Sequence, residues 1–206
     1  MRLIDLKIKD LGVLDYEEVW RSMVEAIDNR PQQALDEVWF VQHPPVYTLG
    51  YAGSELNVLA RDEIPIVRSD RGGQVTYHGP GQLVVYFLIN IKRLGWGPKK
   101  LIFYLEEIFI SLLYKYDIEA KRKKGAPGIY VGDRKIASIG LKIKHGFCYH
   151  GVSLNIDMNL SPFDDINTCG FNNLEVTQIN DLTKVSFLQV KEDVKSLLLD
   201  NNFKAA

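Results

Sequence analysis

The chain has 206 residues, of which 46% are hydrophobic, so it is long enough to bury the core of one domain. Its 25 lysines and arginines are balanced by 26 aspartates and glutamates, which leaves a net charge of −1 and excludes nucleic-acid binding through a globally basic surface. No stretch approaches the ~20 apolar residues of a membrane helix, and the N-terminus lacks the apolar core of a signal peptide, so we expect a cytoplasmic protein that uses no membrane.

The first half of the chain shows strand patterns around one predicted helix. Residues 2–8 alternate weakly between apolar and polar side chains and predict a first strand. Asp15 with Glu18 three positions on is a capping-box pattern, so we expect a helix that begins there and that Pro31 ends. Further strands are predicted after that helix, at 38–41, 64–67 and 83–91.

The second half predicts a helix, a hairpin, a further strand and a closing helix. Pro98 suits the first turn of an apolar helix that extends to Leu113. Gly132-Asp133-Arg134 predicts the turn of a β-hairpin. The elements around and after it are strands at 129–131, 135–143 and 147–156 and a helix at 187–199. Along the chain the predicted strands and helices do not alternate strictly. We therefore expect an α+β fold in which a mixed β-sheet is covered by helices.

A glycine-rich segment at 71–82, RGGQVTYHGPGQ, is predicted to be a loop that leads into the most apolar predicted strand. It holds four glycines and one proline beside two aromatic rings. Glycine has no Cβ, so a ligand can approach the main chain closely and meet exposed backbone N–H groups. We therefore predict that this segment forms one wall of a binding site for an elongated small molecule.

Cys169 and Lys135 are the candidate reactive residues. Cys169 lies beside a glycine in the irregular segment 157–182, where its thiol is either an accessible nucleophile or a side chain that fills a gap. Lys135 begins a strand with small residues, and it is either a solvated surface lysine or a lysine in the mouth of an apolar pocket, where burial disfavours its charged form. Cys148 lies in an apolar strand pattern and is predicted to be a core residue.

Three further patterns bear on ligands and partners. The cysteines and histidines show no metal-ligand spacing, so we expect no structural metal. The stretches 125–128 and 150–153 are punctuated by glycine beside predicted strands, and they are either tight turns or parts of a site. The basic run Lys121–Lys124 is either a solvated edge or a docking surface for an acidic partner protein.

Four stretches, taken in order, resemble the lipoyl(octanoyl) transferase family. They read RGGQVTYHGPGQL, GAPGIYVGDRKIASIGLKI, HGVSLNID and NTCGF. The resemblance implies the fold shared with lipoate and biotin protein ligases, in one domain over 1–206 whose ligase-like core spans about 30–206. Arg71 follows Ser69-Asp70, where ligase relatives favour an arginine pair, and this departure favours the transferase branch.

The resemblance also implies a reaction, its partners and its site. An octanoyl group would pass from octanoyl-acyl carrier protein to a lysine of lipoyl domains, in oxo-acid dehydrogenase complexes and the glycine cleavage H protein, as the first step of lipoate cofactor biosynthesis. Cys169 falls on the family's nucleophilic cysteine and Lys135 on its partner lysine, so a thioester acyl-enzyme is implied, with neither ATP nor a metal as cofactor. The residues that fall on substrate-site segments are Arg71, Gly72, Gly73, Gln74, Val75, Thr76, Tyr77, His78, Ser138, Ile139, Gly140, Gly151, Val152 and Ser153.

Two alternatives to this activity stay open at the level of sequence. An ATP-dependent lipoate–protein ligase on the same fold would activate a free acid and need no cysteine. A non-catalytic acyl-binding scaffold would need neither Cys169 nor Lys135. The resting protonation of that pair is also open, since a neutral lysine beside a thiol and an ammonium–thiolate pair both fit the residues.

Overall fold

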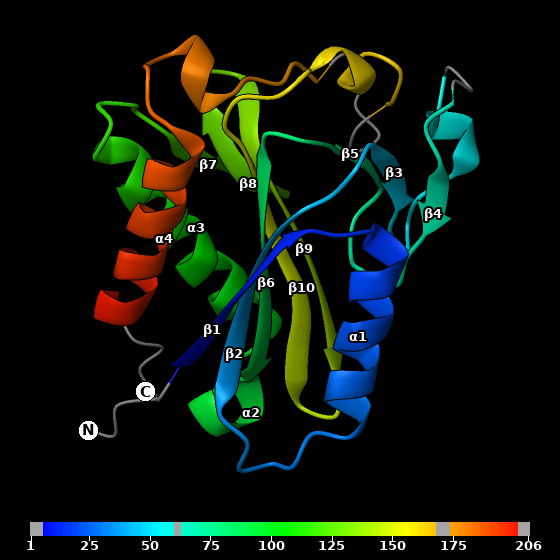
Figure 1. The fold of residues 1–206 in the computed structure, drawn as a ribbon, viewed down its shortest axis with the longest axis vertical. Helices are drawn as coiled ribbons and strands as arrows, with labels where there is room; N and C mark the ends of the chain where they lie inside the picture. The colour runs from blue at the N-terminus through cyan, green and yellow to red at the C-terminus, as the bar shows by residue number, and fades with distance from the viewer. Residues whose placement is uncertain (1–5, 60–62, 168–173, 202–206) are drawn as a thin grey trace.

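The computed structural model of the chain describes residues 6–59, 63–167 and 174–201. A large β-sheet runs through the centre, helices lie on both of its faces, and a second small sheet lies to one side (Figure 1). No helix in these described ranges is long and apolar enough to cross a membrane.

The elements are as follows. The large sheet holds β1 (Leu6–Val13), β2 (Asp36–Gln42), β6 (Gln82–Asn90), β7 (Lys121–Lys123), β8 (Ala126–Val131), β9 (Arg134–Lys144) and β10 (Phe147–Asn155). The small sheet holds β3 (Val46–Leu49), β4 (Ile66–Arg68) and β5 (Val75–His78). The helices are α1 (Tyr16–Asp28), α2 (Ile91–Leu94), α3 (Pro98–Tyr114) and α4 (Phe187–Asn201), with single 3₁₀ turns at Glu55–Asn57, Ser161–Phe163 and Ile179–Asp181.

The strand pairing confirms the predicted fold class. The large sheet has the order β1-β2-β6-β10-β9-β8-β7, and the small sheet has the order β4-β3-β5. β1 and β2 pair in parallel. From β2 to β7 in this order, each strand pairs antiparallel with the next one. The sheet is therefore mixed and is covered by helices, as the sequence predicts.

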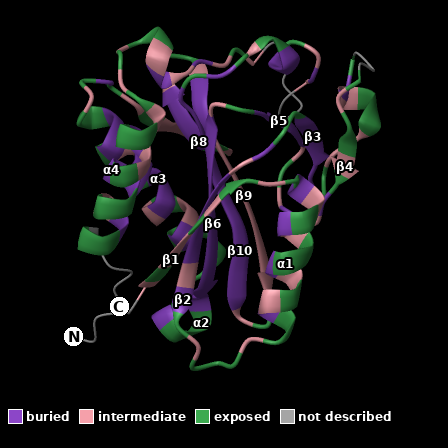
Figure 2. Cartoon of the chain, viewed as in Figure 1, coloured by how far each residue is buried: buried purple, intermediate pink, exposed green. Residues whose placement is uncertain are grey.

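β6 is buried on both faces because its sequence is apolar at almost every position. Side chains alternate across a strand, so Val85 and Phe87 join the cluster beneath α3 and α4, while Val84 and Tyr86 join the cluster beneath α1. A continuous apolar run is the pattern expected of a strand covered on both sides. In Figure 2 the central strands are buried, whereas the outer faces of α1 and α4 are exposed.

The predicted start of α1 is confirmed by its cap. The Asp15 Oδ1 accepts hydrogen bonds from the backbone N–H groups of Glu17 at 2.8 Å and Glu18 at 3.3 Å. Such a cap satisfies N–H groups that have no partner within the first helical turn. The helix ends at Asp28, shortly before Pro31, and Met23 is fully buried against the sheet.

Three predictions about elements need correction. Residues 71–82 were expected to form a loop, but they contain β5, whose side chains at Val75–His78 are buried. β3 was not predicted, because it is a short strand that immediately follows Pro44-Pro45 and gains its pairing from β4 and β5. β1 is Leu6–Val13 and pairs with β2, so it extends beyond the predicted range 2–8; residues 2–5 of that range lie outside the described chain.

Candidate active site

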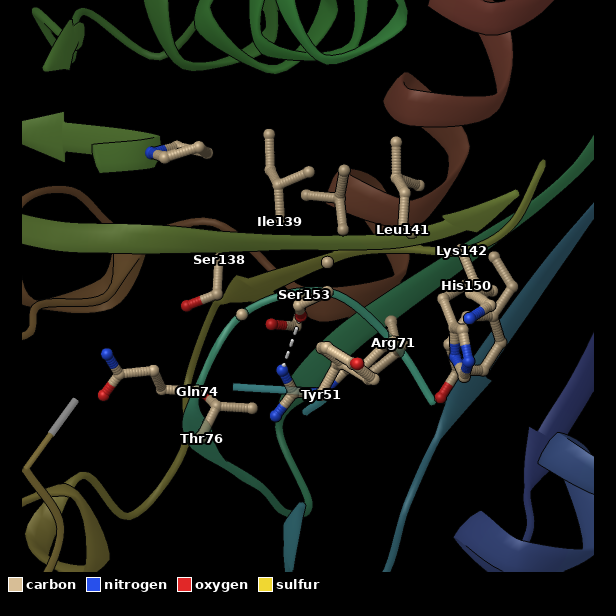
Figure 3. Close-up of a pocket in the computed structure, with 18 of the residues that line it drawn as sticks. Tyr51, Arg71, Gln74, Thr76, Ser138, Ile139, Leu141, Lys142, His150 and Ser153 are labelled. Carbon is tan, nitrogen blue, oxygen red and sulfur yellow. Dashed lines mark hydrogen bonds between the residues drawn. The ribbon is translucent and has the colours of Figure 1, made fainter. Parts of the chain in front are cut away.

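A cavity of about 450 Å³ lies between the glycine-rich segment, β9 and β10. All of the substrate-site residues predicted from the sequence line it, with the exception of Tyr77, and Lys135 lines it too. In Figure 3 Ser138 and Ser153 point toward the side of Gln74 and Thr76, whereas Ile139 points to the opposite side of β9. The structure thus gathers these residues around one cavity, and their roles there stay predictions.

Tyr77 is the predicted site residue that the structure places elsewhere. It lies on β5 between Thr76 and His78, and alternation turns its side chain away from the cavity. Its ring packs against Tyr47 at 5.6 Å and Phe163 at 5.5 Å between centroids. Tyr77 therefore belongs to the core of the small sheet.

The cavity exists because β8 covers only the first part of β9. β8 pairs with β9 between Arg134 and Ser138, whereas β10 pairs with β9 from Ala137 to Lys144. The glycine-rich segment lies against the remaining edge, where the Gly72 N–H donates to the Leu141 carbonyl at 2.9 Å. The short partner strand thus leaves room for a ligand beside β9.

Glycine is required where these segments meet. Gly140 and Gly151 face each other across β9 and β10. A Cβ on Gly140 would lie 2.9 Å from the Gly72 carbonyl oxygen, and a Cβ on Gly151 would lie 1.9 Å from the Val85 carbonyl oxygen. Both distances are shorter than atoms tolerate, so the close approach of main chain around the cavity depends on these two residues.

Substitution of Gly151→Ala is expected to lower the free energy of unfolding by about 3 kcal/mol, because the added methyl group overlaps the backbone of β6. Urea denaturation followed by circular dichroism measures the loss. Gly97→Ala is the matched control, since nothing lies within 4 Å of its added Cβ, and it is expected to cost about 1 kcal/mol or less. Equal costs for the two variants would contradict the close packing at Gly151.

Lys135 is buried in the wall of the cavity, with 4% of its surface exposed. Its Nζ donates a long hydrogen bond of 3.5 Å to the Pro127 carbonyl and lies 5.3 Å from the ring centroid of Tyr130. Gly128 leaves space for the side chain, because a Cβ there would lie 3.1 Å from the Lys135 Cε. The reading of Lys135 as a solvated surface lysine is therefore wrong.

Cys169 lies outside the described residues, but both flanks of its segment are anchored near the site. The Asn167 N–H donates to the Asn57 carbonyl at 2.8 Å. On the other side, the Lys135 N–H donates to the Glu175 carbonyl at 2.9 Å, and the Thr177 N–H donates to the Lys135 carbonyl at 2.9 Å. The chain that follows Cys169 thus pairs with the strand that carries Lys135.

Cys148 is a core residue, as predicted. It is fully buried, and its thiol donates to the Phe87 carbonyl at 3.2 Å. Burial raises the pKa of the Cys148 thiol to about 12. This cysteine therefore stays a thiol at neutral pH and supplies no nucleophile.

Arg71 fixes the shape of the glycine-rich segment. Its guanidinium Nε and Nη2 donate to the Thr48 hydroxyl at 3.1 and 2.8 Å, and Nη1 donates to the Gly72 carbonyl at 3.0 Å. The Thr48 hydroxyl lies 3.3 Å from the His78 Nε2, and the His78 Nδ1 lies 2.7 Å from the Gln82 Oε1. These contacts join β3, β5 and the start of β6 beneath the cavity.

Asp70 is a site residue that the sequence did not predict, and His150 was included only in the stretch 150–153, which the sequence assigns either to a tight turn or to part of a site. His150 lines the cavity, is 1% exposed, and takes a left-handed backbone conformation with φ +62°. Its Nε2 lies 2.8 Å from the Asp70 Oδ1, which also accepts from the Trp20 Nε1 at 2.9 Å. The sequence could have indicated both as site residues, because Asp70 directly precedes Arg71 and His150 begins the stretch HGVSLNID.

The charge states of this pair follow from burial and hydrogen bonding. Burial alone would raise the pKa of Asp70, but hydrogen bonds from His150 and Tyr149 outweigh it and lower the pKa to about 2. Burial lowers the pKa of His150, against the opposing effect of Asp70. At neutral pH the pair is therefore a carboxylate and a neutral imidazole.

His78, which lines the cavity, packs against a second buried histidine, His43, and the sequence did not predict this contact. His43 and His78 have ring centroids 5.9 Å apart, and Tyr16 stacks on His78 at 5.7 Å. Burial lowers the pKa of His43 to about 4 and holds the pKa of His78 well below its ordinary value. These two histidines are therefore neutral at neutral pH.

Two of the four residues of the basic run Lys121–Lys124 form ion pairs within the chain. The Arg122 Nε lies 3.1 Å from a Glu106 carboxylate oxygen, and the Lys123 Nζ lies 2.8 Å from the Asp133 carboxylate. The run forms the edge strand β7 and the turn after it, with Lys121 and Lys124 exposed. The structure thus supports a paired sheet edge more than a dense basic docking surface.

Comparisons with known proteins place the chain in one family. The profile of the lipoyl protein ligase A/B catalytic domain matches residues 15–198. An octanoyltransferase of Pseudomonas savastanoi pv. phaseolicola is 46% identical over 197 residues, which cover 95% of this chain and 90% of that protein. An octanoyltransferase of Shewanella sp. strain W3-18-1 is 52% identical over 173 residues, which cover 84% and 80%.

Solved structures share the fold at much lower identity. A lipoate protein ligase of T. acidophilum with bound lipoic acid has a TM-score of 0.75 at 15% identity, over 95% of this chain and 85% of that one. A biotin protein ligase of Aquifex aeolicus in complex with biotin and ATP has a TM-score of 0.56 at 12% identity, over 97% and 70%. With the profile match and the identities to octanoyltransferases, the chain belongs to the lipoyl protein ligase A/B catalytic domain family, in its octanoyltransferase branch.

Proposed function

We propose that the chain transfers an octanoyl group from octanoyl-acyl carrier protein to a lysine of lipoyl domains, through a thioester on Cys169 and with Lys135 as the proton carrier. The single observation that carries this proposal is the buried Lys135 in the cavity wall, paired through its backbone with the chain that follows Cys169. Glu175 is only six residues from Cys169, so the thiol is within reach of this end of the cavity.

The first half of the reaction is a thioester exchange. The Cys169 sulfur attacks the carbonyl carbon of the donor thioester, and its proton passes to Lys135. The bond from that carbon to the phosphopantetheine sulfur breaks, and Lys135 returns the proton to the departing thiol. One thioester replaces another, so the step is close to neutral in free energy and needs no nucleotide or metal.

The second half forms the amide. The amine of the lipoyl-domain lysine attacks the acyl-enzyme carbonyl, the carbon–nitrogen bond forms, and the Cys169 sulfur leaves as thiolate. Lys135 takes the proton that the amine loses and returns it to Cys169. Backbone N–H groups of the glycine-rich segment are the candidate donors to the oxyanion in both halves.

The cavity suits a single acyl chain. Its volume of about 450 Å³ lies within the range of small-molecule sites. Val84 and Tyr86 supply apolar wall, and the glycines let the main chain lie against the ligand. An extended hydrocarbon that passes between the glycine-rich segment and β9 fits these surfaces.

Mass spectrometry of the intact protein tests the acyl-enzyme. After incubation with octanoyl-acyl carrier protein and no ATP, we expect one octanoyl group, located on Cys169 by peptide mapping. Cys169→Ser is expected to stay unmodified, although it keeps the buried Cys148 whose pKa is about 12. An unmodified wild-type protein whose activity requires ATP would favour the ligase. Full biological function of Cys169→Ser in cells, with no octanoyl transfer by the wild-type protein, would favour the acyl-binding scaffold.

A further inference from the structure

One row of residues crosses the large sheet beneath the cavity, at the level of Lys135. Strand register places Gly128 of β8 opposite Ser138 of β9. Ser153 of β10 lies between Ser138 on one side and Val84 of β6 on the other. Directly opposite residues of paired strands have their side chains on the same face of the sheet. Because Ser138, Ser153 and Val84 all line the cavity, this row forms part of its floor.

The cavity becomes deeper along this row and ends at Val84. Ser138 is half-buried, Ser153 is 5% exposed and Val84 is 2% exposed. Val41 of β2 is opposite Val84 and continues the row, but it does not line the cavity. The side chains also grow along the row, from glycine and two serines to a branched valine. Val84 is therefore the first bulky side chain that a ligand meets from the side of β9.

The glycine-rich segment covers the floor. Gln74 and Thr76 line the cavity, and Ser138 and Ser153 point toward their side of it (Figure 3). Thr76 lies on β5 and is 8% exposed, so this cover belongs to the ordered small sheet. A chain that follows the row thus passes between two walls and crosses the strands.

The row matches the length of an octanoyl chain. A Cβ on Gly128 would lie 3.4 Å from the Lys135 Nζ, so a carbonyl served by Lys135 lies near the Gly128 end of the row. Neighbouring strands are about 4.8 Å apart, so Val84, two strands from Ser138, is about 10 Å away from it. An extended octanoyl group is about 9 Å long, since each of its seven carbon–carbon bonds advances the chain by about 1.25 Å. With its carbonyl between Gly128 and Ser138, the terminal methyl group reaches the Val84 side chain.

We propose that the Val84 side chain closes the inner end of the acyl site and thereby sets the chain length that the enzyme transfers. An octanoyl chain ends in contact with the Val84 methyl groups, whereas a decanoyl chain, two methylene groups longer, would overlap them. The chemistry at the carbonyl is that of the proposed function, on which this inference rests.

The test compares acyl groups of different length. Pantetheine thioesters of octanoate and decanoate are used as donors to a lipoyl domain, and the ratio of kcat/KM for decanoyl to that for octanoyl is measured. One methylene group in an apolar pocket changes kcat/KM by about 10- to 200-fold, so we expect a ratio of about 0.1 or less for the wild-type enzyme. In Val84→Ala the ratio is expected to rise at least about tenfold, because the truncated side chain leaves room for the longer chain.

Val85→Ala is the matched control. It removes the same atoms from the next residue of β6, which is fully buried in the cluster beneath α3 and α4 and does not line the cavity. Both truncations are expected to destabilise the fold to a similar degree, but only Val84→Ala should change the ratio. An equal ratio in the wild-type protein and Val84→Ala, or an equal rise in both variants, would overturn the proposal. So would a wild-type enzyme that transfers both acyl groups equally well.

Val84→Ile changes the site in the opposite direction. Isoleucine keeps the branched shape of valine and adds one methylene group, which shortens the space for the chain. The ratio of kcat/KM for hexanoyl to that for octanoyl is therefore expected to rise by about tenfold or more. An unchanged ratio would count against Val84 as the end of the site.

A measurement on the wild-type protein removes any dependence on the folding of the variants. In the octanoyl-enzyme with isotope-labelled valine methyl groups, we expect a nuclear Overhauser effect between the terminal methyl group of the chain and Val84, and none to Val85. An octanoyl-enzyme that lacks the contact with Val84 would overturn this inference alone. A wild-type protein that forms no octanoyl-enzyme would instead contradict the proposed function, so the two failures are distinguishable.

Discussion

Replacement of Lys135→Met is expected to lower kcat for octanoyl transfer by about 10²- to 10⁴-fold, which is the usual contribution of a positioned proton carrier. Methionine preserves the length of the side chain and its contacts with Gly128 and Tyr130, but it cannot hold a proton. The free energy of unfolding should therefore fall much less than the activity. Transfer is measured with octanoyl-acyl carrier protein as donor and a lipoyl domain as acceptor.

The matched control is Lys144→Met. Lys144 lies on the same strand and pairs with Asp28, and it does not line the cavity. Its exposed ion pair contributes little stability, so both activity and unfolding should stay close to those of the wild-type protein. Comparable loss of activity in the two variants would show that removal of any lysine from β9 disturbs the enzyme and would contradict a specific role for Lys135.

Lys135→Arg distinguishes the two resting states that the sequence leaves open. Arginine keeps the positive charge but does not release its proton at any pH that the protein tolerates. If the lysine only stabilises a Cys169 thiolate through its charge, the arginine variant should regain much of the activity lost in Lys135→Met. If Lys135 receives and returns protons during turnover, the arginine variant should be as impaired as the methionine variant.

The local parts of the fold were predictable because they depend on neighbours in sequence. Asp15 with Glu18 located the start of α1, the turn Gly132-Asp133-Arg134 located the hairpin of β8 and β9, and the apolar run of β6 located the central strand. Each signal acts over a few residues. β3 gave no such signal, because a four-residue strand after two prolines is stabilised by pairing with β4 and β5.

The candidate site was predictable only where its residues lie in glycine-rich motifs. His150 meets Asp70 across 80 positions of sequence, because His150 pairs with Leu141 and the N–H of Gly72, two residues after Asp70, donates to the Leu141 carbonyl. Tyr77 was predicted to line the site because it lies between residues that do, and the alternation of a strand not foreseen in 71–82 turns it away. Long-range register is thus the information that motif spacing lacks.

The buried histidines predict a large loss of stability in mild acid. His43 has a pKa of about 4 in the folded protein because burial disfavours its charged form, against 6.5 as its ordinary value. Between these two pH values the unfolded chain binds more protons than the folded one, so stability is complete above pH 6.5 and falls as the pH drops toward 4. At pH 5 His43 alone should cost about 2 kcal/mol.

His78 and His150 add to this loss, because burial lowers the pKa of each. The lowered pKa of Asp70 stabilises the folded protein, and this stabilisation is lost only as the pH falls from 3.8, the ordinary pKa of an aspartate, toward about 2. Asp70 therefore does not change the stability between pH 7 and 5. For a domain with a typical stability of about 5–15 kcal/mol, the histidines together would remove much of it by pH 5. Urea unfolding at pH 7, 6 and 5 should therefore show midpoints that fall steeply.

His43→Gln assigns the effect to a particular ring. The variant removes one group that takes up a proton on unfolding, so the slope of unfolding free energy against pH near pH 5 should decrease by about one proton, or about 1.4 kcal/mol per pH unit. A wild-type stability that stays constant from pH 7 to 5 would contradict the lowered pKa values of the buried histidines.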